Sequence, residues 1–475
     1  MLAAFLPPYP FRAQSAPYLW CYYRLLCEWE NESALFITGR DYVRPVSDWL
    51  GRWECEDDAA KRLDYTLPFD TQPQQHEYLW LDDNIFSSWL ELCQGNPLSA
   101  FRSFLDGRDS LYESELYELL FTVSDKIEAL ITFCNIPSLS AVCQKLKIPL
   151  IHMELGPLRG HIYRDTSYFD FQGVNGNTEI ESRERKFGTW NLPKLYLTDL
   201  LHFFITDVKK LPEQTDALGV VLQVEDDSNL VAFGNGMSNQ SLILAATQKQ
   251  KNVLVRTHPG SIFSLRQGKF EIDASLSSLE FVSRCKKIMT INSSVALEAL
   301  LLGKEVTIFG DSSLLYLSKD SQIDRNFTSR LAFYLFAYLV PRKIQCLPEY
   351  IRFRLAYPSE IDIIKYHLHH YMKEDNMIIP KKMEAEDISS QLCSQVWASN
   401  KLKQEIAELK EQLFECQKSL NALGESHSYA MSIVEERDKQ IKSIQAILDK
   451  QNEQLNTIRH HPVLSYYISN FMPNI

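Results

Sequence analysis

The chain has 475 residues, of which 45% are hydrophobic and 23% charged, and its formal net charge is −12. This length fits two domains plus an additional segment, and the composition excludes a chain that is disordered throughout. The acidic balance argues against nucleic acid as a partner, because nucleic-acid-binding surfaces are basic.

The start of the chain does not have the pattern of a signal peptide. Residues 1–11 hold a short apolar patch that is broken by Pro7, Pro8 and Pro10 and has no basic segment before it. The longest apolar run, 331–340, has about half the length that a membrane span needs. The ten cysteines include no Cys-x-x-Cys pair, which fits a reducing compartment. We expect a cytoplasmic protein, with at most peripheral contact at the inner face of the cytoplasmic membrane.

The first region, residues 1–210, contains a β-α-β unit. Residues 129–135 and 148–153 are apolar runs rich in β-forming residues. The segment between them begins at Pro137, a frequent first-turn residue, and has apolar residues at helical spacing up to Leu146. Such a unit predicts a parallel sheet.

The second region, residues 215–390, alternates strand and helix patterns and predicts a second doubly wound sheet. Its predicted strands are 218–224, 252–256, 287–291 and 305–309, and its predicted helices are 238–248 and 295–302. The expected fold is therefore α/β, with two Rossmann-like domains.

A coiled coil is expected at 396–460. Steps of four and three from Leu402 to Ile458 visit seventeen positions, of which fourteen are apolar. Gly424 lies in the middle of this pattern, and a single long helix that lies on the globular part is the alternative. The tail, 461–475, is apolar and aromatic, and it suits docking on a domain, a partner or a membrane surface.

Ligands of open parallel sheets bind at the carboxyl ends of the strands, so polar residues that directly follow the predicted strands are candidates. Asn292, Ser293 and Ser294 precede a helix, whose amino end favours a phosphate. The same residue types are preferred helix caps, which is the structural alternative. Glu298 lies on the same otherwise apolar helix; it is either a buried carboxylate that needs a partner, such as a ribose diol, or a surface residue.

His258 follows the strand that ends at Arg256, and Pro259 fixes the backbone beside it. A histidine at this place can donate a hydrogen bond to a leaving phosphate or protonate it. Most single histidines are structural, but the serine turn after the next clear strand favours a functional role.

Three adjacent acids, Glu225, Asp226 and Asp227, follow another strand. They are a solvated turn, part of a metal site that no nearby residue completes, or the source of a carboxylate nucleophile. In the first region, Glu154 and Arg159 flank a rigid Gly-Pro turn after a strand and would face the cleft between the domains.

Together these motifs resemble a known family. The Glu-x-Gly turn at 154–156, the His-Pro pair at 258–259 and the Ser-Ser turn at 293–294 resemble bacterial transferases that use CMP-activated acidic sugars and have the GT-B-type fold. Residues 223–228, Gln-Val-Glu-Asp-Asp-Ser, resemble the retaining β-Kdo transferases of capsule and O-antigen synthesis, and Tyr168 to Asn175 resembles the first domain of that family. The similarity covers roughly 130–315. Leu-Gly at 155–156, where the capsule enzymes have Asp-Gly, points to the O-antigen branch.

The resemblance implies a role for each residue. Asp227 would be the nucleophile that forms a covalent Kdo intermediate. It is preferred to Asp226 because the family pattern is Gln-x-Glu-x-Asp, which Gln223, Glu225 and Asp227 fit, and the position of Asp226 in that pattern is variable. Glu154 would be the acid/base for the acceptor hydroxyl.

The remaining candidates would bind the donor, CMP-Kdo. His258, with the turn Asn292-Ser293-Ser294, would hold its phosphate, Glu298 its ribose, and Arg159 or Arg256 the sugar carboxylate. No cofactor and no metal are implied. The acceptor would be a lipid-linked or free oligosaccharide. The coiled coil would mediate self-association or contact other polysaccharide-synthesis proteins.

Three alternatives compete with this interpretation. An inverting transferase of the same fold would use CMP-sialic acid, with Glu154 as the base and Asp227 as a bystander. A non-catalytic scaffold would use the coiled coil to assemble a polysaccharide machine. A metal-dependent hydrolase would use Asp226 and Asp227.

Overall fold

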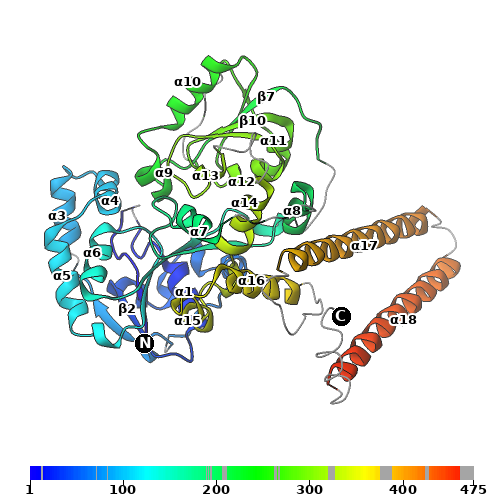
Figure 1. Cartoon of the computed structure of the whole chain (residues 1–475), viewed down its shortest axis with the longest axis horizontal. Helices are drawn as coiled ribbons and strands as arrows, with labels where there is room; N and C mark the ends of the chain where they lie inside the picture. The colour runs from blue at the N-terminus through cyan, green and yellow to red at the C-terminus, as the bar shows by residue number, and fades with distance from the viewer. Residues whose placement is uncertain are drawn as a thin grey trace. The chain divides into compact units, whose positions relative to one another are not determined.

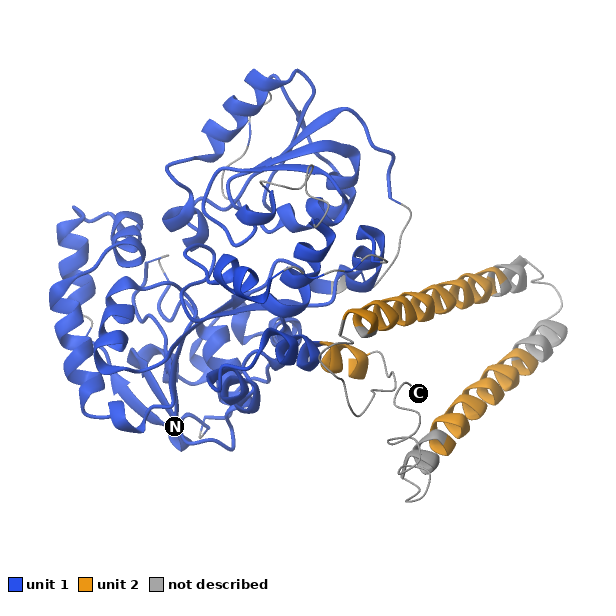
Figure 2. Cartoon of the chain, viewed as in Figure 1, with its two compact units in different colours: residues 1–367 blue, residues 368–475 orange. Residues whose placement is uncertain are grey.

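In the computed structural model, the chain folds into two compact units, residues 1–367 and 368–475 (Figure 2). The residues that it describes are 1–11, 14–70, 72–82, 84–188, 190, 192, 195–205, 211–261, 265, 268–318, 327–374, 388–422 and 427–460.

The first unit contains a seven-stranded sheet with the order β12-β6-β5-β4-β1-β2-β3. Its strand β2 is labelled in Figure 1. Strands β1 to β5 are parallel, whereas β6 runs antiparallel to β5 and β12 antiparallel to β6. The strands are β1 (Leu2–Phe5), β2 (Ala34–Thr38), β3 (Glu77–Trp80), β4 (Ala129–Thr132), β5 (Leu150–Leu155), β6 (Thr166–Asp170) and β12 (Val340–Pro341).

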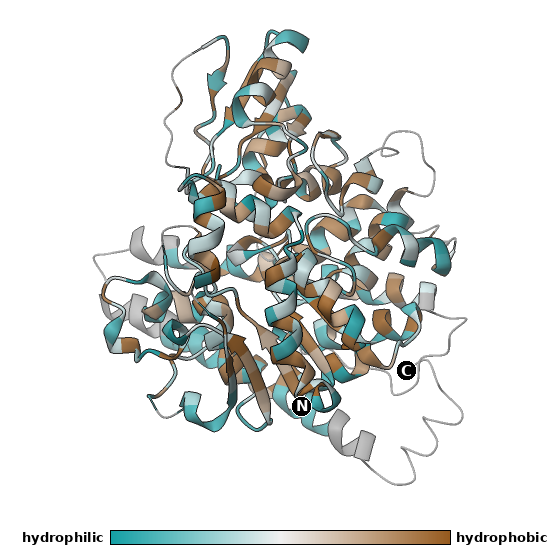
Figure 3. Cartoon of the chain, turned by 90° about the vertical axis from the view of Figure 1, so that its left-hand side faces the viewer, coloured by the Kyte–Doolittle hydropathy of each residue, from teal (hydrophilic) through white to brown (hydrophobic). Residues whose placement is uncertain are grey.

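Helices cover both faces of this sheet, because the side chains of each strand alternate between two cores. In β1, Leu2 and Ala4 pack into one core and Ala3 and Phe5 into the other. Brown, apolar strands mark this buried layer in Figure 3. The helices of this part are α1 (Leu19–Glu28), α2 (Asp57–Leu63), α3 (Asn84–Leu92), α4 (Pro97–Asp106), α5 (Ser110–Phe121), α6 (Pro137–Leu146), α7 (Ile180–Phe187), α8 (Leu197–Phe204) and α15 (Pro348–Leu355).

The second sheet of this unit has five parallel strands in the order β11-β10-β7-β8-β9. The prediction of an α/β fold with two Rossmann-like domains is thereby confirmed; the second sheet is parallel throughout, and the first is parallel except for β6 and β12. The strands are β7 (Ala217–Val221), β8 (Val253–Arg256), β9 (Glu271–Ile272), β10 (Cys285–Thr290) and β11 (Glu305–Ile308). The helices are α9 (Ser228–Phe233), α10 (Asn239–Lys249), α11 (Ser278–Arg284), α12 (Val295–Leu301) and α13 (Leu315–Ser318).

Both sheets reverse their strand order at one point, which lies between β1 and β4 in the first sheet and between β7 and β10 in the second. Loops at such a point diverge to opposite faces and leave a crevice outside the carboxyl ends of the strands. The two crevices are therefore the places where the fold itself favours a ligand.

After the second sheet the chain returns to the first. Helix α14 (Phe327–Phe333) and a π-helical turn (Tyr334–Tyr338) lead into β12, and α15 and α16 (Glu360–Glu374) follow. The indole of Trp29, the residue directly after α1, donates a hydrogen bond of 2.9 Å to the Cys346 carbonyl. Residues within the predicted 215–390 region thus also complete the first sheet.

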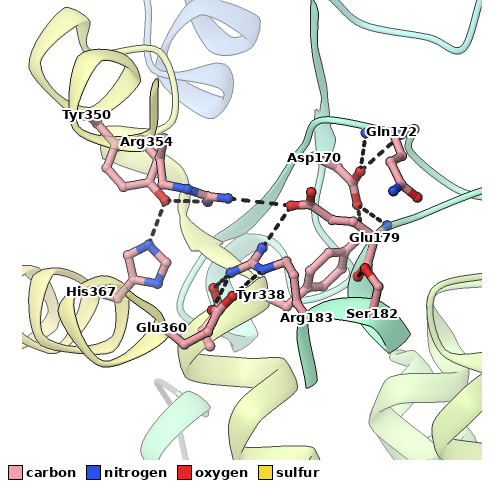
Figure 4. A network of polar contacts seen from close by, with 12 residues as sticks. Asp170, Gln172, Glu179, Ser182, Arg183, Tyr338, Tyr350, Arg354, Glu360 and His367 are labelled. Atoms are coloured by element: carbon pink, nitrogen blue, oxygen red, sulfur yellow. Dashed lines mark hydrogen bonds and ion pairs between the residues drawn. The ribbon is translucent and has the colours of Figure 1, made fainter. Parts of the chain in front are cut away.

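A buried ionic network fixes this return segment beside the loop that follows β6 (Figure 4). Arg183 binds both oxygens of Glu360, at 2.8 and 2.7 Å, and contacts Glu179 at 3.2 Å. Asp170 accepts a hydrogen bond of 2.8 Å from Tyr338 and further ones from the backbone of the loop, at Gln172, Gly173 and Glu179. These contacts stiffen the loop that carries the segment with the family resemblance.

The second unit contains two long helices, α17 (Ile388–Ala422) and α18 (His427–His460). Helix is confirmed for most of the predicted 396–460 segment, whereas the coiled coil remains a prediction. The apolar tail, 461–475, and Gly424 lie outside the described residues. Within the described ranges, no helix is long and apolar enough to cross a membrane.

Candidate functional site

A cavity of about 590 Å³ opens at the carboxyl ends of the strands of both sheets. The segments that follow β1, β5, β7, β8 and β10 all contribute to its lining. The cavity contains ten of the eleven residues that the sequence singles out: Glu154, Arg159, Gln223, Asp227, Arg256, His258, Asn292, Ser293, Ser294 and Glu298. Residues more than a hundred positions apart in the sequence thus converge on one site.

Glu154 lies at the end of β5, and its environment favours the protonated form. Burial raises its pKa to about 7; the backbone N–H of Leu155, at 2.7 Å from Oε1, and the charge of Arg159 oppose this shift, and the charge of Asp227 adds to it. The Gly156 turn that follows is tight, because an added Cβ would lie 2.5 Å from the Thr166 carbonyl carbon. A carboxyl group with this pKa can both give and take a proton near neutrality.

Asp227 lines the same cavity as Glu154 and lies at the start of α9. Its Oδ1 accepts a hydrogen bond of 2.9 Å from the Asn229 backbone N–H and caps the helix. The cap orients the carboxylate, and its charge adds to the effect of burial on the pKa of Glu154. The neighbouring Asp226 does not belong to the lining.

Gln223 and Asn292 bridge the crevice of the second sheet, between the ends of β7 and β10. The Gln223 amide donates to Asn292 Oδ1 at 2.8 Å, and the Asn292 backbone N–H donates to Gln223 Oε1 at 3.0 Å. Both side chains are buried. They hold the two loops of the crevice together and have a structural role whether or not they contact a ligand.

His258 has a defined orientation at the end of β8. Its Nδ1 accepts a hydrogen bond of 2.9 Å from the Gly260 backbone N–H, so in the neutral ring the proton is on Nε2. Partial burial lowers the pKa of His258, and the charges of Asp227 and Glu225 oppose this shift. The neutral imidazole is therefore arranged to donate one hydrogen bond through Nε2.

In the serine turn after β10, one side chain caps α12, as the structural alternative expected. Ser293 Oγ accepts a hydrogen bond of 3.3 Å from the Val295 backbone N–H at the start of α12. Ser294 is the cap residue itself and makes no such side-chain bond. Because α12 has only seven residues, its dipole is weaker than that of a longer helix.

Glu298 is buried and bonded to both sides of the cavity. The Tyr163 hydroxyl donates to its Oε2 at 3.0 Å, and the Ser278 hydroxyl donates to its Oε1 at 2.9 Å. Burial raises its pKa to about 7, although the two hydrogen bonds and the charge of Arg256 oppose this shift. The surface alternative for Glu298 is therefore excluded, because its exposed fraction is 5%.

The two candidate arginines differ in their partners. Arg256 pairs with the buried Asp273 at 2.6 Å and also donates to the Ser275 carbonyl. Arg159 is exposed, and its Nε donates to the Gly156 carbonyl at 2.5 Å. Arg159 is therefore more accessible to an anionic ligand than Arg256.

Glu225 is the one predicted residue that the cavity lining does not include. Its Oε1 accepts a hydrogen bond of 2.8 Å from Asn239, and its carboxylate lies 3.4 Å from the Ser261 hydroxyl. It anchors the loop that carries Asp227.

Several lining residues were missed at the level of sequence. Tyr163, Asn229 and Ser278 bind the predicted residues, and the turn 312–314 completes the wall. Another group consists of aromatic residues near the start of the chain. None of these lining residues belongs to a recognisable chemical motif. Their position after short apolar runs could have indicated that they lie at the ends of strands. Among the described residues, no group of three or more His, Cys, Asp or Glu side chains is arranged to hold a metal.

Residues 4–179 match the model of the Glycosyltransferase 99 family N-terminal domain. Among solved structures, the chain is similar to the β-Kdo 2,7 transferase of KpsC from Thermosulfurimonas dismutans, with 15% identity over 49% of this chain and 90% of the other and a TM-score of 0.36. The β-Kdo 2,4 transferase of the same protein is 17% identical over 39% of this chain and 70% of the other, with a TM-score of 0.30. A UDP-GlcNAc 2-epimerase from Methanocaldococcus jannaschii is 12% identical over 75% of this chain and 99% of the other, with a TM-score of 0.25. No curated protein matches the chain. The predicted resemblance to glycosyltransferases is thus confirmed at the level of this N-terminal domain; the donor, the stereochemistry and the O-antigen branch remain predictions.

Proposed function

We propose that the chain is a retaining transferase that moves Kdo from CMP-Kdo to a saccharide acceptor in O-antigen or capsule synthesis. The observation that carries the proposal is the convergence of Glu154 and Asp227 on one cavity, from two different sheets. A double displacement requires such a pair, with one carboxylate as the nucleophile and the other as the acid/base.

In the first step a carboxylate oxygen of Asp227 attacks the anomeric carbon of Kdo. The bond from that carbon to the phosphate oxygen breaks, its electron pair leaves with CMP, and a glycosyl ester of Asp227 forms. His258 Nε2–H, with the hydroxyls of Ser293 and Ser294, would donate to the departing phosphate. Arg159 would pair with the Kdo carboxylate, and the step needs no metal.

In the second step an acceptor hydroxyl attacks the same carbon and returns Asp227 to the carboxylate, while Glu154 takes the hydroxyl proton. The two steps are coupled through charge. Esterification removes the negative charge of Asp227, which is one of the causes that raise the pKa of Glu154. Formation of the intermediate therefore lowers this pKa and favours the base form when the base is required.

The ribose of CMP is assigned to Glu298, whose two oxygens already have donors. A ribose hydroxyl would compete for Oε2 with the hydroxyl of Tyr163, which comes from the first-sheet part of the unit. Donor binding would then loosen a contact between the two sides of the cavity.

One observation favours an inverting transferase that uses CMP-sialic acid. Asp227 already has a structural role as the cap of α9, so it could be a bystander while Glu154 acts as a single base. The stereochemistry of the product separates the two mechanisms.

The decisive experiment is intact-mass analysis after incubation with freshly made CMP-Kdo. We expect a mass gain of one Kdo residue that maps to the peptide of Asp227 and is absent in Asp227→Asn, which keeps the helix cap. Asp226→Ala is the matched control and should still form the adduct. CMP release without an adduct in either protein would favour the inverting mechanism, and failure to bind CMP would favour the scaffold.

A further inference from the structure

The two sides of the cavity differ in chemistry. The second sheet contributes mostly polar side chains, including Gln223, Asp227 and His258. The segment that follows β1, together with α4, contributes a wall of five uncharged side chains, here named the aromatic wall: Phe11, Pro17, Tyr18, Trp20 and Phe101. This wall was not among the predicted site residues, and the proposed donor contacts do not use it.

The inner part of the aromatic wall is held rigidly. Phe11 stacks on Phe101 with ring centroids 5.1 Å apart, and Phe104 lies 4.9 Å from Phe11. Both Phe11 and Phe101 are buried, with exposed fractions of 5% and 4%. They support the wall but offer little surface to a ligand.

Tyr18 and Trp20 form the accessible part of the wall, since both are only half-buried. The Trp20 ring lies edge-on to Phe133, 5.7 Å away at 68°, and the Tyr18 backbone N–H donates to the Tyr42 hydroxyl at 3.1 Å. Tyr18, Trp20 and Glu154 line the same cavity, so the rings share it with the proposed acid/base.

We propose that the aromatic wall is the acceptor subsite and that Trp20, with Tyr18, binds the terminal ring of a neutral sugar, whose free hydroxyl then faces Glu154. The C–H face of a pyranose is apolar, and burying it on a rigid aromatic ring is favourable without any charged partner. None of the five wall residues is charged, so the wall itself favours a neutral hexose or N-acetylhexosamine over an acidic sugar. The exposed Arg62 of α2 also lines the cavity and is the group that an acidic sugar would use instead. This inference rests on the proposed function, because it assigns the second substrate of that site.

The test measures sugar binding and donor binding separately. Saturation-transfer NMR with the methyl glycosides of glucose, galactose, rhamnose, N-acetylglucosamine and glucuronic acid reports sugar binding, and calorimetry with CMP reports the donor side. The variants are Trp20→Ala and Trp20→Phe, with Trp397→Ala as the matched control, because Trp397 is 39% exposed on α17 and does not line the cavity.

We expect wild type and Trp397→Ala to bind at least one neutral glycoside, and Trp20→Ala to weaken that binding at least tenfold. Trp20→Phe should retain most of it, and the CMP affinity of all three variants should stay within twofold of wild type, which also shows that they are folded. Unchanged glycoside binding in Trp20→Ala, binding of the glucuronide alone, or no glycoside binding by wild type would each overturn the acceptor assignment. Failure of wild type to bind CMP would instead count against the proposed function.

Discussion

The Tyr163 hydroxyl and Glu298 Oε2 lie 3.0 Å apart and join a segment that follows β5 to a helix of the second sheet. Ser278 donates to the other oxygen of Glu298, so each oxygen already accepts one hydrogen bond before a nucleotide arrives. A carboxylate oxygen can accept a second hydrogen bond, but Glu298 is buried, with an exposed fraction of 5%, so there is little room for another donor. We therefore expect a ribose hydroxyl to compete with Tyr163 for Oε2, in a contact that joins the two sides of the cavity.

Removal of this contact should favour the nucleotide. We expect Tyr163→Phe to bind CMP a few-fold more tightly, because a ribose hydroxyl no longer competes with the phenol for Glu298. The free energy of unfolding should fall by about 1 kcal/mol, the usual net value of one hydrogen bond. Calorimetry and urea unfolding measure the two effects. Weaker CMP binding in Tyr163→Phe would indicate instead that Tyr163 holds Glu298 in place for the ligand.

The acid/base role predicts a pH dependence of transfer. The pKa of Glu154 is raised to about 7, and the base form is the one that accepts the acceptor proton. The transfer rate should therefore rise with pH through a midpoint at about 7, or somewhat lower if the charge of Asp227 is lost in the intermediate, and level off about one unit above that midpoint. Glu154→Gln should lower this rate at least about 100-fold and abolish the rise in the pH–rate profile near pH 7. A pH profile in Glu154→Gln that matches the wild type would remove Glu154 from the mechanism.

The buried Glu298 predicts a pH dependence of stability. Its pKa in the folded protein is about 7, above the ordinary value of 4.5, so its contribution to stability is present below about pH 4.5 and is lost as the pH rises through about 7. Glu298→Gln mimics the neutral form. The difference in free energy of unfolding, Glu298→Gln minus wild type, should be larger at pH 8 than at pH 5, by at most about 3 kcal/mol. Urea titrations at the two pH values measure the gain, and Glu91→Gln, exposed on α3, is the control. An equal difference at both pH values would contradict the prediction.

Helix α17 carries an apolar stripe that predicts self-association. Ile406, Leu409 and Leu413 recur at heptad spacing and are 44%, 64% and 45% exposed. Leu409→Glu should lower the mass measured by light scattering, whereas Lys410→Glu, on a different face of the helix, should not. An unchanged mass in Leu409→Glu would exclude this stripe as the oligomer contact.

The sequence predicted the second sheet better than the first, for a physical reason. Buried parallel strands read as apolar runs, and each polar residue directly after such a run, such as His258 or Asn292, is at the edge where ligands bind. Strand β1 has only four residues before a run of prolines, so the centre of the first sheet was not recognised.

Other features depend on contacts between distant residues, which local patterns do not encode. Tyr163 and Glu298 are 135 positions apart, and only the folded chain brings them together. From the sequence alone, Trp20 cannot be distinguished from a tryptophan in the core. Its packing on Phe133 and its exposure to the cavity both depend on the tertiary structure. The capping role of Ser293 was predicted as an alternative, whereas that of Asp227 was not, and the structure contains both beside the cavity.

The return of the chain to β12 has a consequence for folding during synthesis. The second sheet, from Ala217 to Ile308, is complete before Val340 and Pro341 leave the ribosome. Until then β6 is an uncovered edge, and Trp29 lacks its acceptor at Cys346. The domain that is synthesised first therefore completes its sheet last. Between the synthesis of β6 and that of β12, its open edge must be protected from other chains.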